Sequence, residues 1–269
     1  MKARLFVTAA AAAIALIPSP ALAWGKTGHR VVAAIADAQL SGLARAHIKE
    51  ILGSAESLDE AANWPDEMRS APTQFWQKTA TPWHYVTLNG VLYDHAPSEG
   101  DALEALQRYT ATLRDPNASL ADKQLALRFI VHLVGDLHQP LHASTRVSKS
   151  QPNGDHGGNL VKLCSGCRDQ LHGFWDGASG DDDTPAGIVS TAKTMHVATG
   201  AQTADLNPRH WADESLALAK SDVYHTPIGA GAGPFTVNSA YRQNAQKIAA
   251  ARVTLAAARL AGILNAELK

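Results

Sequence analysis

The sequence has almost no net charge, which limits how it can bind charged partners. Its 24 Lys and Arg residues and 25 Asp and Glu residues give a formal net charge of −1, and the isoelectric point is about 6.9. A protein that binds nucleic acid through lysine and arginine alone is usually more basic. If this protein handles phosphates, the positive charge must therefore come from another source.

Long apolar runs are also scarce, and the clearest one lies at the N-terminus. Lys2 and Arg4 precede an apolar stretch at 5–17, and Ala21 and Ala23 fit a small-x-small cleavage site. The stretch is shorter than the ~20 residues of an ordinary transmembrane helix. It favours a signal peptide over residues 1–23 rather than an uncleaved anchor. The mature chain, 24–269, would be secreted or periplasmic without a membrane anchor, and we find no later segment apolar enough to span a bilayer.

Cysteine is nearly absent. The only two cysteines are Cys164 and Cys167 in LCSGC, and no second CxxC exists to complete a zinc site. Because a signal peptide implies an oxidising compartment, we favour a short disulfide that pins a loop over free thiols.

Internal repeats, low-complexity linkers and strong strand signals are lacking as well, so the mature length predicts one mainly α-helical domain. The best strand candidate is GGNLVKL, which leads into the cysteine loop as a small β-hairpin. Apolar periodicity or capping residues predict helices over 30–40, 42–52, 102–114 and 121–138, and others near Asp169, Trp211 and Asn238. Glycine and proline predict loops at 97–100, 154–158 and 229–234.

The segment FIVHLVGDLHQPLH carries the first chemical signal. His132 and Asp136 are four residues apart on a predicted helix, so they lie on one face and can share one ion. Pro140 has no N–H to bond the carbonyl of Asp136, so the helix should end or kink there. That break can turn His142 toward a neighbouring ion.

A second HxxxD pair follows in LHGFWD, with His172 and Asp176. A single such pair is usually a surface ion pair, but two pairs beside a proline break favour a metal site. Imidazole and carboxylate without thiolate suit zinc in a catalytic setting. Further candidates are His29, Asp66 and His84. Five histidines lie outside any candidate metal motif, and we interpret them as surface or core residues: His47, His95, His196, His210 and His225.

The motifs WGKTGH, WPDEMR, PWHY, HLVGDLHQPLH, GDHGGN, LHGFWD and WADES resemble those of the zinc-dependent S1/P1-type nucleases. That family includes the plant bifunctional nucleases and shares its fold with zinc-dependent phospholipase C. The motifs occur in the family's order across most of the mature chain. The resemblance implies one helical, monomeric domain at 24–269 that holds three Zn²⁺. The implied ligands are Asp66, His84, His132 and Asp136 for the first ion, His142, His172 and Asp176 for the second, and Trp24, His29 and Asp136 for the third.

The resemblance also explains why the expected signal peptide ends before a tryptophan. In the family the mature chain starts with tryptophan, whose α-amine and carbonyl oxygen bind zinc. Signal cleavage before Trp24 would create that ligand, since an α-amine has a pKa near 7.7–8.0 and loses its proton readily to a metal. Three Zn²⁺ and three aspartates leave a formal charge of about +3, which attracts phosphate to an otherwise neutral protein.

By the same resemblance, the protein cleaves single-stranded DNA and RNA to 5′-phosphate products and acts on 3′-nucleotides. A hydroxide from a water shared by the first and third zinc ions, which Asp66 and Asp136 help to hold, attacks phosphorus in line, and the second zinc stabilises the departing 3′-oxygen. Arg69 contacts the phosphate, Asn159 hydrogen-bonds the base and Tyr85 stacks on it. Thr87 replaces an aspartate of the fungal members, which leaves base preference open.

Two other classes fit parts of the pattern. Zinc-dependent phospholipase C also begins with tryptophan, but its last ligand motif is HxxxE rather than HxxxD. A periplasmic zinc-binding protein without enzymatic activity fits the histidines but leaves Arg69, Asn159 and Tyr85 without a role.

Overall fold

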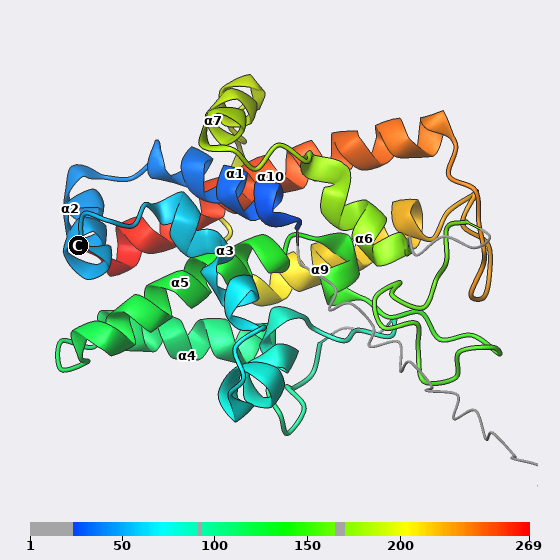
Figure 1. The fold of residues 1–269 in the computed structure, drawn as a ribbon, viewed down its shortest axis with the longest axis horizontal. Helices are drawn as coiled ribbons and strands as arrows, with labels where there is room; N and C mark the ends of the chain where they lie inside the picture. The colour runs from blue at the N-terminus through cyan, green and yellow to red at the C-terminus, as the bar shows by residue number, and fades with distance from the viewer. Residues whose placement is uncertain (1–23, 91–92, 165–169) are drawn as a thin grey trace, which may run out of the picture.

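The fold was analysed in a computed structural model, which describes residues 24–90, 93–164 and 170–269. It is mainly α-helical, as the sequence predicts (Figure 1). The helices are α1 (Lys26–Asp37), α2 (Gly42–Leu52), α3 (Leu58–Met68), α4 (Ala102–Arg114), α5 (Leu120–Asp136), α6 (Leu171–Asp176), α7 (Pro185–Thr194), α8 (Ala201–Ala204), α9 (Pro208–Leu218) and α10 (Ser239–Glu267). Short 3₁₀ or π turns are η1 (Phe75–Thr79), η2 (Thr81–His84), η3 (Pro140–Ala143), η4 (Gly177–Ser179) and η5 (Ala219–Val223).

Helix boundaries follow the local chemistry that the sequence shows. The Ser41 hydroxyl accepts a hydrogen bond from the Ala44 N–H and begins α2, and Gly53, at φ +81°, ends it. The end of α5 and the start of η3 confirm the expected effect of Pro140: α5 ends at Asp136, and η3 begins at the proline.

Three expectations need correction. Among the described residues, the predicted GGNLVKL hairpin is reduced to one isolated antiparallel bridge, between Lys162 and Gln170, with no regular strand. Periodicity missed α3, although Ser57 and Glu60 form a capping box at its start. By length and composition, α10 is apolar enough to cross a membrane, but 67% of its apolar window is buried inside the protein. The expected signal peptide and Cys167 lie outside the described residues, so the signal peptide and the Cys164–Cys167 disulfide remain predictions.

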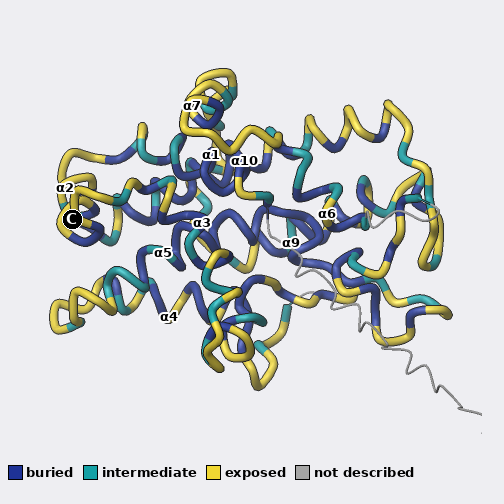
Figure 2. The backbone as a smooth tube through the Cα atoms, in the orientation of Figure 1, coloured by how far each residue is buried: buried dark blue, intermediate teal, exposed yellow. Residues whose placement is uncertain are grey.

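The interior is built around α5. Helix α4 packs along α5, and α1 packs between α3 and α10. Figure 2 shows the C-terminal part of α5 and most of α1 and α3 buried, whereas α7 and the outer turns of α4 are exposed. The buried face of α5 brings apolar side chains and the polar His132 and Asp136 into the same interior. Metal-type residues therefore sit in the buried core.

A buried ionic network fixes the segment that follows α5. Glu214 on α9 accepts hydrogen bonds from Arg252 and Arg259 on α10, each at 2.7 Å. Arg259 also donates to His138 Nε2 at 2.9 Å, and Arg252 donates to the His138 carbonyl at 3.1 Å. Burial and the two guanidinium groups hold the pKa of His138 well below its usual value, so the ring is a neutral acceptor. The network thus anchors the chain between Asp136 and His142.

Replacing Arg259 with alanine should lower the free energy of unfolding by about 3 kcal/mol, because Arg259 is fully buried and its loss leaves Glu214, which is 28% exposed, without one of its two cationic partners. Urea denaturation measures this loss. Arg114→Ala is the matched control: Arg114 pairs with Glu267 on the surface, and its side chain is 67% exposed. That change should cost much less, because solvent screens an exposed ion pair, and equal losses in the two variants would contradict a stabilising role for the network around Glu214.

Candidate metal centre

The last turn of α5 places His132 and Asp136 side by side, as the four-residue spacing predicts. His132 Nε2 lies 3.1 Å from Asp136 Oδ2, and both side chains are fully buried. His132 Nδ1 donates a hydrogen bond to the Ala62 carbonyl at 2.8 Å. Because a carbonyl can only accept, Nδ1 carries a proton, and Nε2 is the ring nitrogen that faces the carboxylate.

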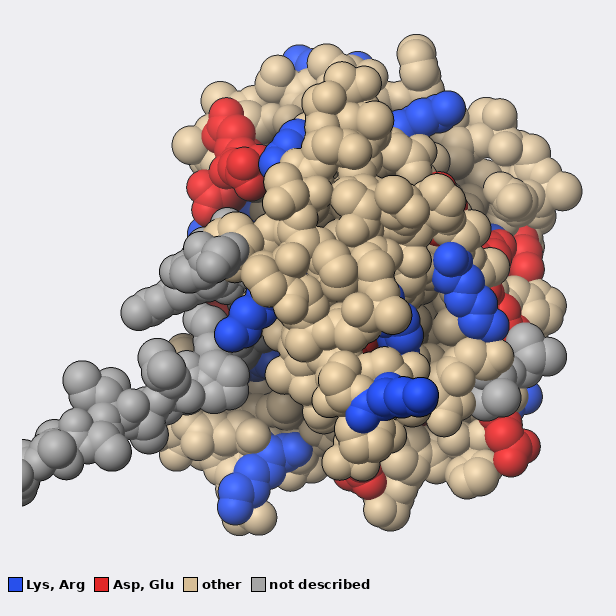
Figure 3. Space-filling model, turned by 90° about the vertical axis from the view of Figure 1, so that its right-hand side faces the viewer, with Lys and Arg blue, Asp and Glu red and all other residues tan. Residues whose placement is uncertain are grey.

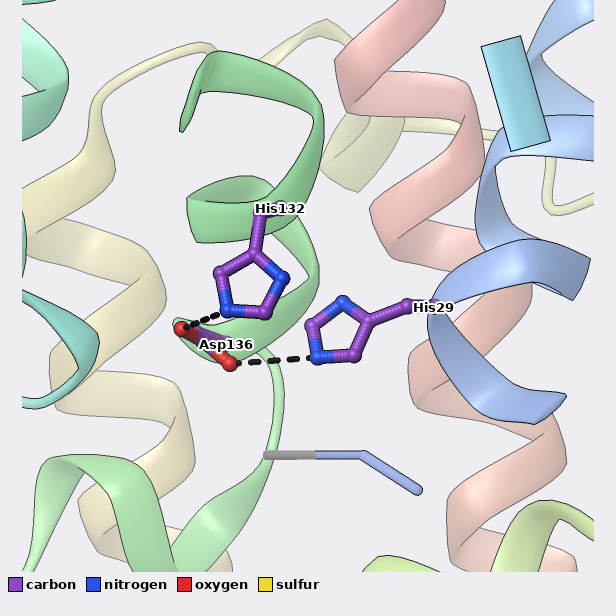
Figure 4. Close-up of side chains that lie close together, drawn as sticks. All are labelled: His29, His132 and Asp136. Atoms are coloured by element: carbon purple, nitrogen blue, oxygen red, sulfur yellow. Dashed lines mark ion pairs between the residues drawn. The ribbon is translucent and has the colours of Figure 1, made fainter. Parts of the chain in front are cut away.

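Helix α1 brings His29 to the other side of the same carboxylate. His29 Nε2 lies 3.4 Å from Asp136 Oδ1, and its ring stacks on that of His132 with centroids 4.0 Å apart. Figure 4 shows both imidazoles directed at Asp136 from different helices. Gly135 permits this approach, since a Cβ there would lie 2.8 Å from His29 Nδ1.

Asp66 on α3 and His84 on η2 complete a group around His132. His84 Nδ1 lies 2.8 Å from His132 Nε2 and 3.4 Å from Asp136 Oδ2. Asp66 Oδ1 lies 3.6 Å from His84 Nδ1 and 3.8 Å from His132 Nε2. The four residues implied for the first zinc therefore converge from α3, η2 and α5.

His142, His172 and Asp176 form a separate group on η3 and α6. His142 Nδ1 donates to the His84 carbonyl at 2.7 Å, and His172 Nδ1 donates to the Gly157 carbonyl at 2.6 Å. Both Nε2 atoms are therefore left with lone pairs, yet they face each other at 3.2 Å. Asp176 Oδ2 lies 3.6 Å from His172 Nε2. Two facing lone pairs beside a carboxylate repel each other unless a cation lies among them.

Several buried atoms at the centre have no hydrogen-bond partner among the described residues. They include both oxygens of Asp136, both ring nitrogens of His29, and His84 Nε2. Leaving such atoms unpaired costs free energy, and nitrogen and carboxylate oxygen are donors that zinc accepts. The residues present thus fit metal ions. The groups whose ligand atoms lie within 4.8 Å of one another are His29, His132 and Asp136; Asp66, His84 and His132; and His142, His172 and Asp176.

Burial and neighbouring charges shift the pKa values of these residues and so set their protonation. Burial lowers the pKa of His29 to about 4, and burial together with His142 lowers that of His172 to about 3, so both rings are neutral. Burial opposes ionisation of Asp136, but the His132 and His142 rings hold its pKa well below the usual value. Burial likewise opposes a charged His132, but the surrounding carboxylates raise its pKa to about 9. His132 would have to release its Nε2 proton to hold a metal ion here.

Trp24 is buried at the start of α1. Its Cβ lies 2.7 Å from the position that a Cβ on Gly28 would take, so glycine there lets the indole pack against the helix. The next residue, Gly25, donates its N–H to the Asp176 carbonyl at 2.9 Å. The start of the described chain is thereby tied to α6, close to both His29 and Asp176. Metal binding by the Trp24 amine remains a prediction.

The residues predicted to contact substrate are placed less tightly. Arg69 Nη1 lies 3.5 Å from Asp66 Oδ1, and its charge opposes the rise that burial causes in the pKa of the nearby Tyr85 phenol. Tyr85 is 41% exposed, so its ring can meet a ligand. The Asn159 side chain donates to the His156 carbonyl at 2.8 Å. Their roles toward substrate stay predictions.

Sequence reasoning missed the groups that orient the ligands. Gln139 is fully buried and donates to Asp176 Oδ1 at 2.6 Å. Backbone carbonyls of Ala62, His84 and Gly157 fix the three imidazoles described above. A backbone carbonyl cannot be recognised from the sequence, whereas Gln139, next to Pro140 inside the metal motif, was a signal that could have been used.

The prediction that the remaining histidines are surface residues holds for His95, His196, His210 and His225, which are exposed, and for His47, which is half-buried and pairs with Glu50.

Fold and site together define a mainly helical protein with a buried histidine–aspartate centre suited to metal ions. The chain belongs to the S1/P1 nuclease family, whose model matches residues 24–269, and this confirms the resemblance drawn from the motifs. It is 32% identical to nuclease S1 of Aspergillus oryzae, over 64% of this chain and 59% of that protein. It is also 32% identical to nuclease P1 of Penicillium citrinum, over 57% of each chain. Endonuclease 2 of Arabidopsis thaliana is 29% identical over 57% of this chain and 54% of its own. The alignments thus span less than two thirds of these relatives.

Proposed function

We propose that the chain is a secreted or periplasmic zinc-dependent nuclease that cleaves single-stranded DNA and RNA to 5′-phosphate products and acts on 3′-nucleotides. The observation that carries the proposal is the buried Asp136 carboxylate, which four histidine rings approach within 3.1–3.4 Å. Family membership supports the reaction class, since the matched relatives are named nucleases and endonucleases.

The proposed metal sites account for phosphate binding by a nearly neutral protein. Figure 3 shows lysine and arginine side chains spread separately over one face, among neutral residues. With such a surface, an interior centre of about +3 would attract phosphate more strongly than scattered cations in water. When bound, zinc ions supply Lewis acidity toward phosphoryl oxygens and a nucleophile from water at neutral pH.

This chain's own residues have three tasks in the proposal. Asp66 and Asp136 hold the ions, Arg69 binds the phosphate and stabilises its charge in the transition state, and Tyr85 and Asn159 position a base. Arg69 is suited to its task because its 3.5 Å contact with Asp66 keeps the guanidinium beside the metal-type residues.

A direct assay offers the exported chain single-stranded DNA, RNA and lecithin in parallel. We expect products with 5′-phosphate ends from both nucleic acids and no phosphoryl headgroup release from lecithin. Cleavage of lecithin alone would indicate a phospholipase. A protein that binds zinc but cleaves none of the three would be a binding protein, and either result would overturn the proposal.

We further expect the initial rate on a single strand to exceed that on its duplex by at least about tenfold, because freeing a paired base costs a few kcal/mol. Tyr85→Ala should slow single-strand cleavage, while Tyr85→Phe, which keeps the aromatic face, should not. Gel assays with one labelled oligonucleotide, alone and annealed, measure both effects. Equal rates on the two substrates would remove base stacking from the account.

A further inference from the structure

The loop that leads from η3 to α6 contains an unusual run of backbone conformations. His156, Gly157 and Gly158 have φ values of +51°, +62° and +81° in succession. His156 is the one residue other than glycine with positive φ in the described part of the chain, and such a conformation costs free energy that surrounding contacts must offset. Neither glycine can be replaced easily: a Cβ on Gly157 would lie 2.5 Å from the Leu141 carbonyl oxygen.

This left-handed turn has one clear consequence at the metal centre. It aims the Gly157 carbonyl at His172 Nδ1, which donates to it at 2.6 Å. The bond settles which nitrogen of His172 carries the proton and leaves Nε2 facing His142 and Asp176. The geometry of the turn therefore decides whether His172 is presented as a ligand.

The Asp155 carboxylate holds the turn. Asp155 is fully buried, and its Oδ1 accepts hydrogen bonds from the N–H groups of Gly158 and Arg146 at 3.1 and 2.9 Å. The Tyr224 hydroxyl donates to the same oxygen at 3.0 Å. Asp155 thus joins three stretches of chain at one atom, and its link to His172 runs through the Gly157–Gly158 backbone.

Arg146 locks this junction from outside. Its guanidinium donates to the carbonyls of Gly229 and Gly231 at 2.9 and 3.0 Å and stacks over the Tyr224 ring at 4.3 Å. The Arg146 Nε atom lies 3.8 Å from Asp155 Oδ2. The Asp155 carboxylate therefore lies beside the Arg146 cation and accepts from the Tyr224 hydroxyl, whose ring stacks under that cation. These contacts restrict the movement of the carboxylate.

We propose that Asp155 is a positioning residue for His172: it holds the left-handed turn that fixes the tautomer and direction of this imidazole. The inference rests on the proposed zinc site at His142, His172 and Asp176. A residue that only stabilised the loop would affect unfolding without changing zinc affinity at that site or the protonation of His172.

The test measures zinc binding and imidazole NMR on the exported chain. In Asp155→Ala, affinity for one of three zinc ions should fall about ten- to a hundredfold, the usual effect of removing an outer-shell partner. In the metal-free protein, the ¹⁵N signals of His172 should change from an Nδ1–H ring to a mixture of tautomers. Asp155→Asn should restore most of both properties, because its amide oxygen can still accept from Gly158 and Arg146.

The matched control is Asp101→Ala. Asp101 is also buried and accepts two backbone N–H groups, of Leu103 and Glu104, at 2.9 and 3.0 Å. This variant should lose stability yet keep three zinc ions and an unchanged His172 signal. If Asp155→Ala does not fold, Tyr224→Phe replaces it, and we expect weaker binding of the same ion.

The outcomes separate the two proposals. A wild-type chain that binds no zinc at His142, His172 and Asp176 would overturn the proposed metal site itself. A wild-type chain with three ions, together with an Asp155→Ala or Tyr224→Phe variant of unchanged zinc affinity and unchanged His172 signals, would overturn the positioning role alone.

Discussion

Replacing either His132 or His172 by alanine should lower nuclease activity at least about a hundredfold, which corresponds to roughly 2.7 kcal/mol on the reaction barrier. His132 Nε2 lies 2.8 Å from His84 Nδ1 and 3.1 Å from Asp136 Oδ2, so it is central to one group. His172 Nε2 faces His142 at 3.2 Å in the other. Each substitution therefore removes a donor from a different proposed zinc ion. Initial rates on single-stranded DNA, with zinc content measured on the same samples, report the effect.

His225→Ala is the control for that experiment. His225 is an exposed histidine that belongs to none of the three groups, so its loss should leave rate and zinc content unchanged. If both buried-histidine variants kept more than about a tenth of wild-type activity, a barrier change below roughly 1.4 kcal/mol, the assignment of the centre would be wrong.

A chain made in the cytoplasm with a retained methionine before Trp24 should be inactive or strongly weakened. The nitrogen of Trp24 would then be an amide, and an amide binds zinc poorly while it keeps its proton. The geometry makes the loss matter, because Gly25 is tied to Asp176 at 2.9 Å and Trp24 is buried close to His29. The third proposed ion would keep His29, Asp136 and a carbonyl, too few donors to hold it tightly.

Export of the same protein with the predicted signal peptide should restore a third zinc ion and full activity. Mass spectrometry of the N-terminus, metal analysis and the single-strand assay on both preparations form the comparison. A methionine-extended chain with three tightly held ions and undiminished turnover would show that Trp24 serves only in packing.

Local patterns in the sequence predicted much of the centre because they act over one or two helical turns. The four-residue interval from His132 to Asp136 becomes a 3.1 Å contact, and Pro140 ends α5 before His142 turns inward on η3. The structure was needed for the contacts between helices that lie far apart in the sequence. Periodicity carried no information on the approach of α1 to α5, which stacks His29 on His132; the resemblance to known nucleases implied only that His29 shares an ion with Asp136.

The same limit explains what was wrong or missed. The strand signal in GGNLVKL is real in composition, but the segment leaves a tight turn, and its backbone pairs with Gln170 through one isolated bridge and with the 232–235 segment through hydrogen bonds of Lys162. Composition alone cannot distinguish α10 from a membrane-spanning helix, since burial in a protein core and burial in lipid favour the same residues. The orienting contact of Asp155 depends on positive φ values in the following turn, which no motif records.

The most direct test of the account is anomalous diffraction from crystals of the exported chain, collected above and below the zinc absorption edge. We predict three zinc-specific peaks, each about 2.0–2.2 Å from its nitrogen and oxygen ligands. One should lie among Asp66, His84, His132 and Asp136, one among His142, His172 and Asp176, and one among Trp24, His29 and Asp136. Zinc-specific density outside these groups, or none within them, would contradict the assignment.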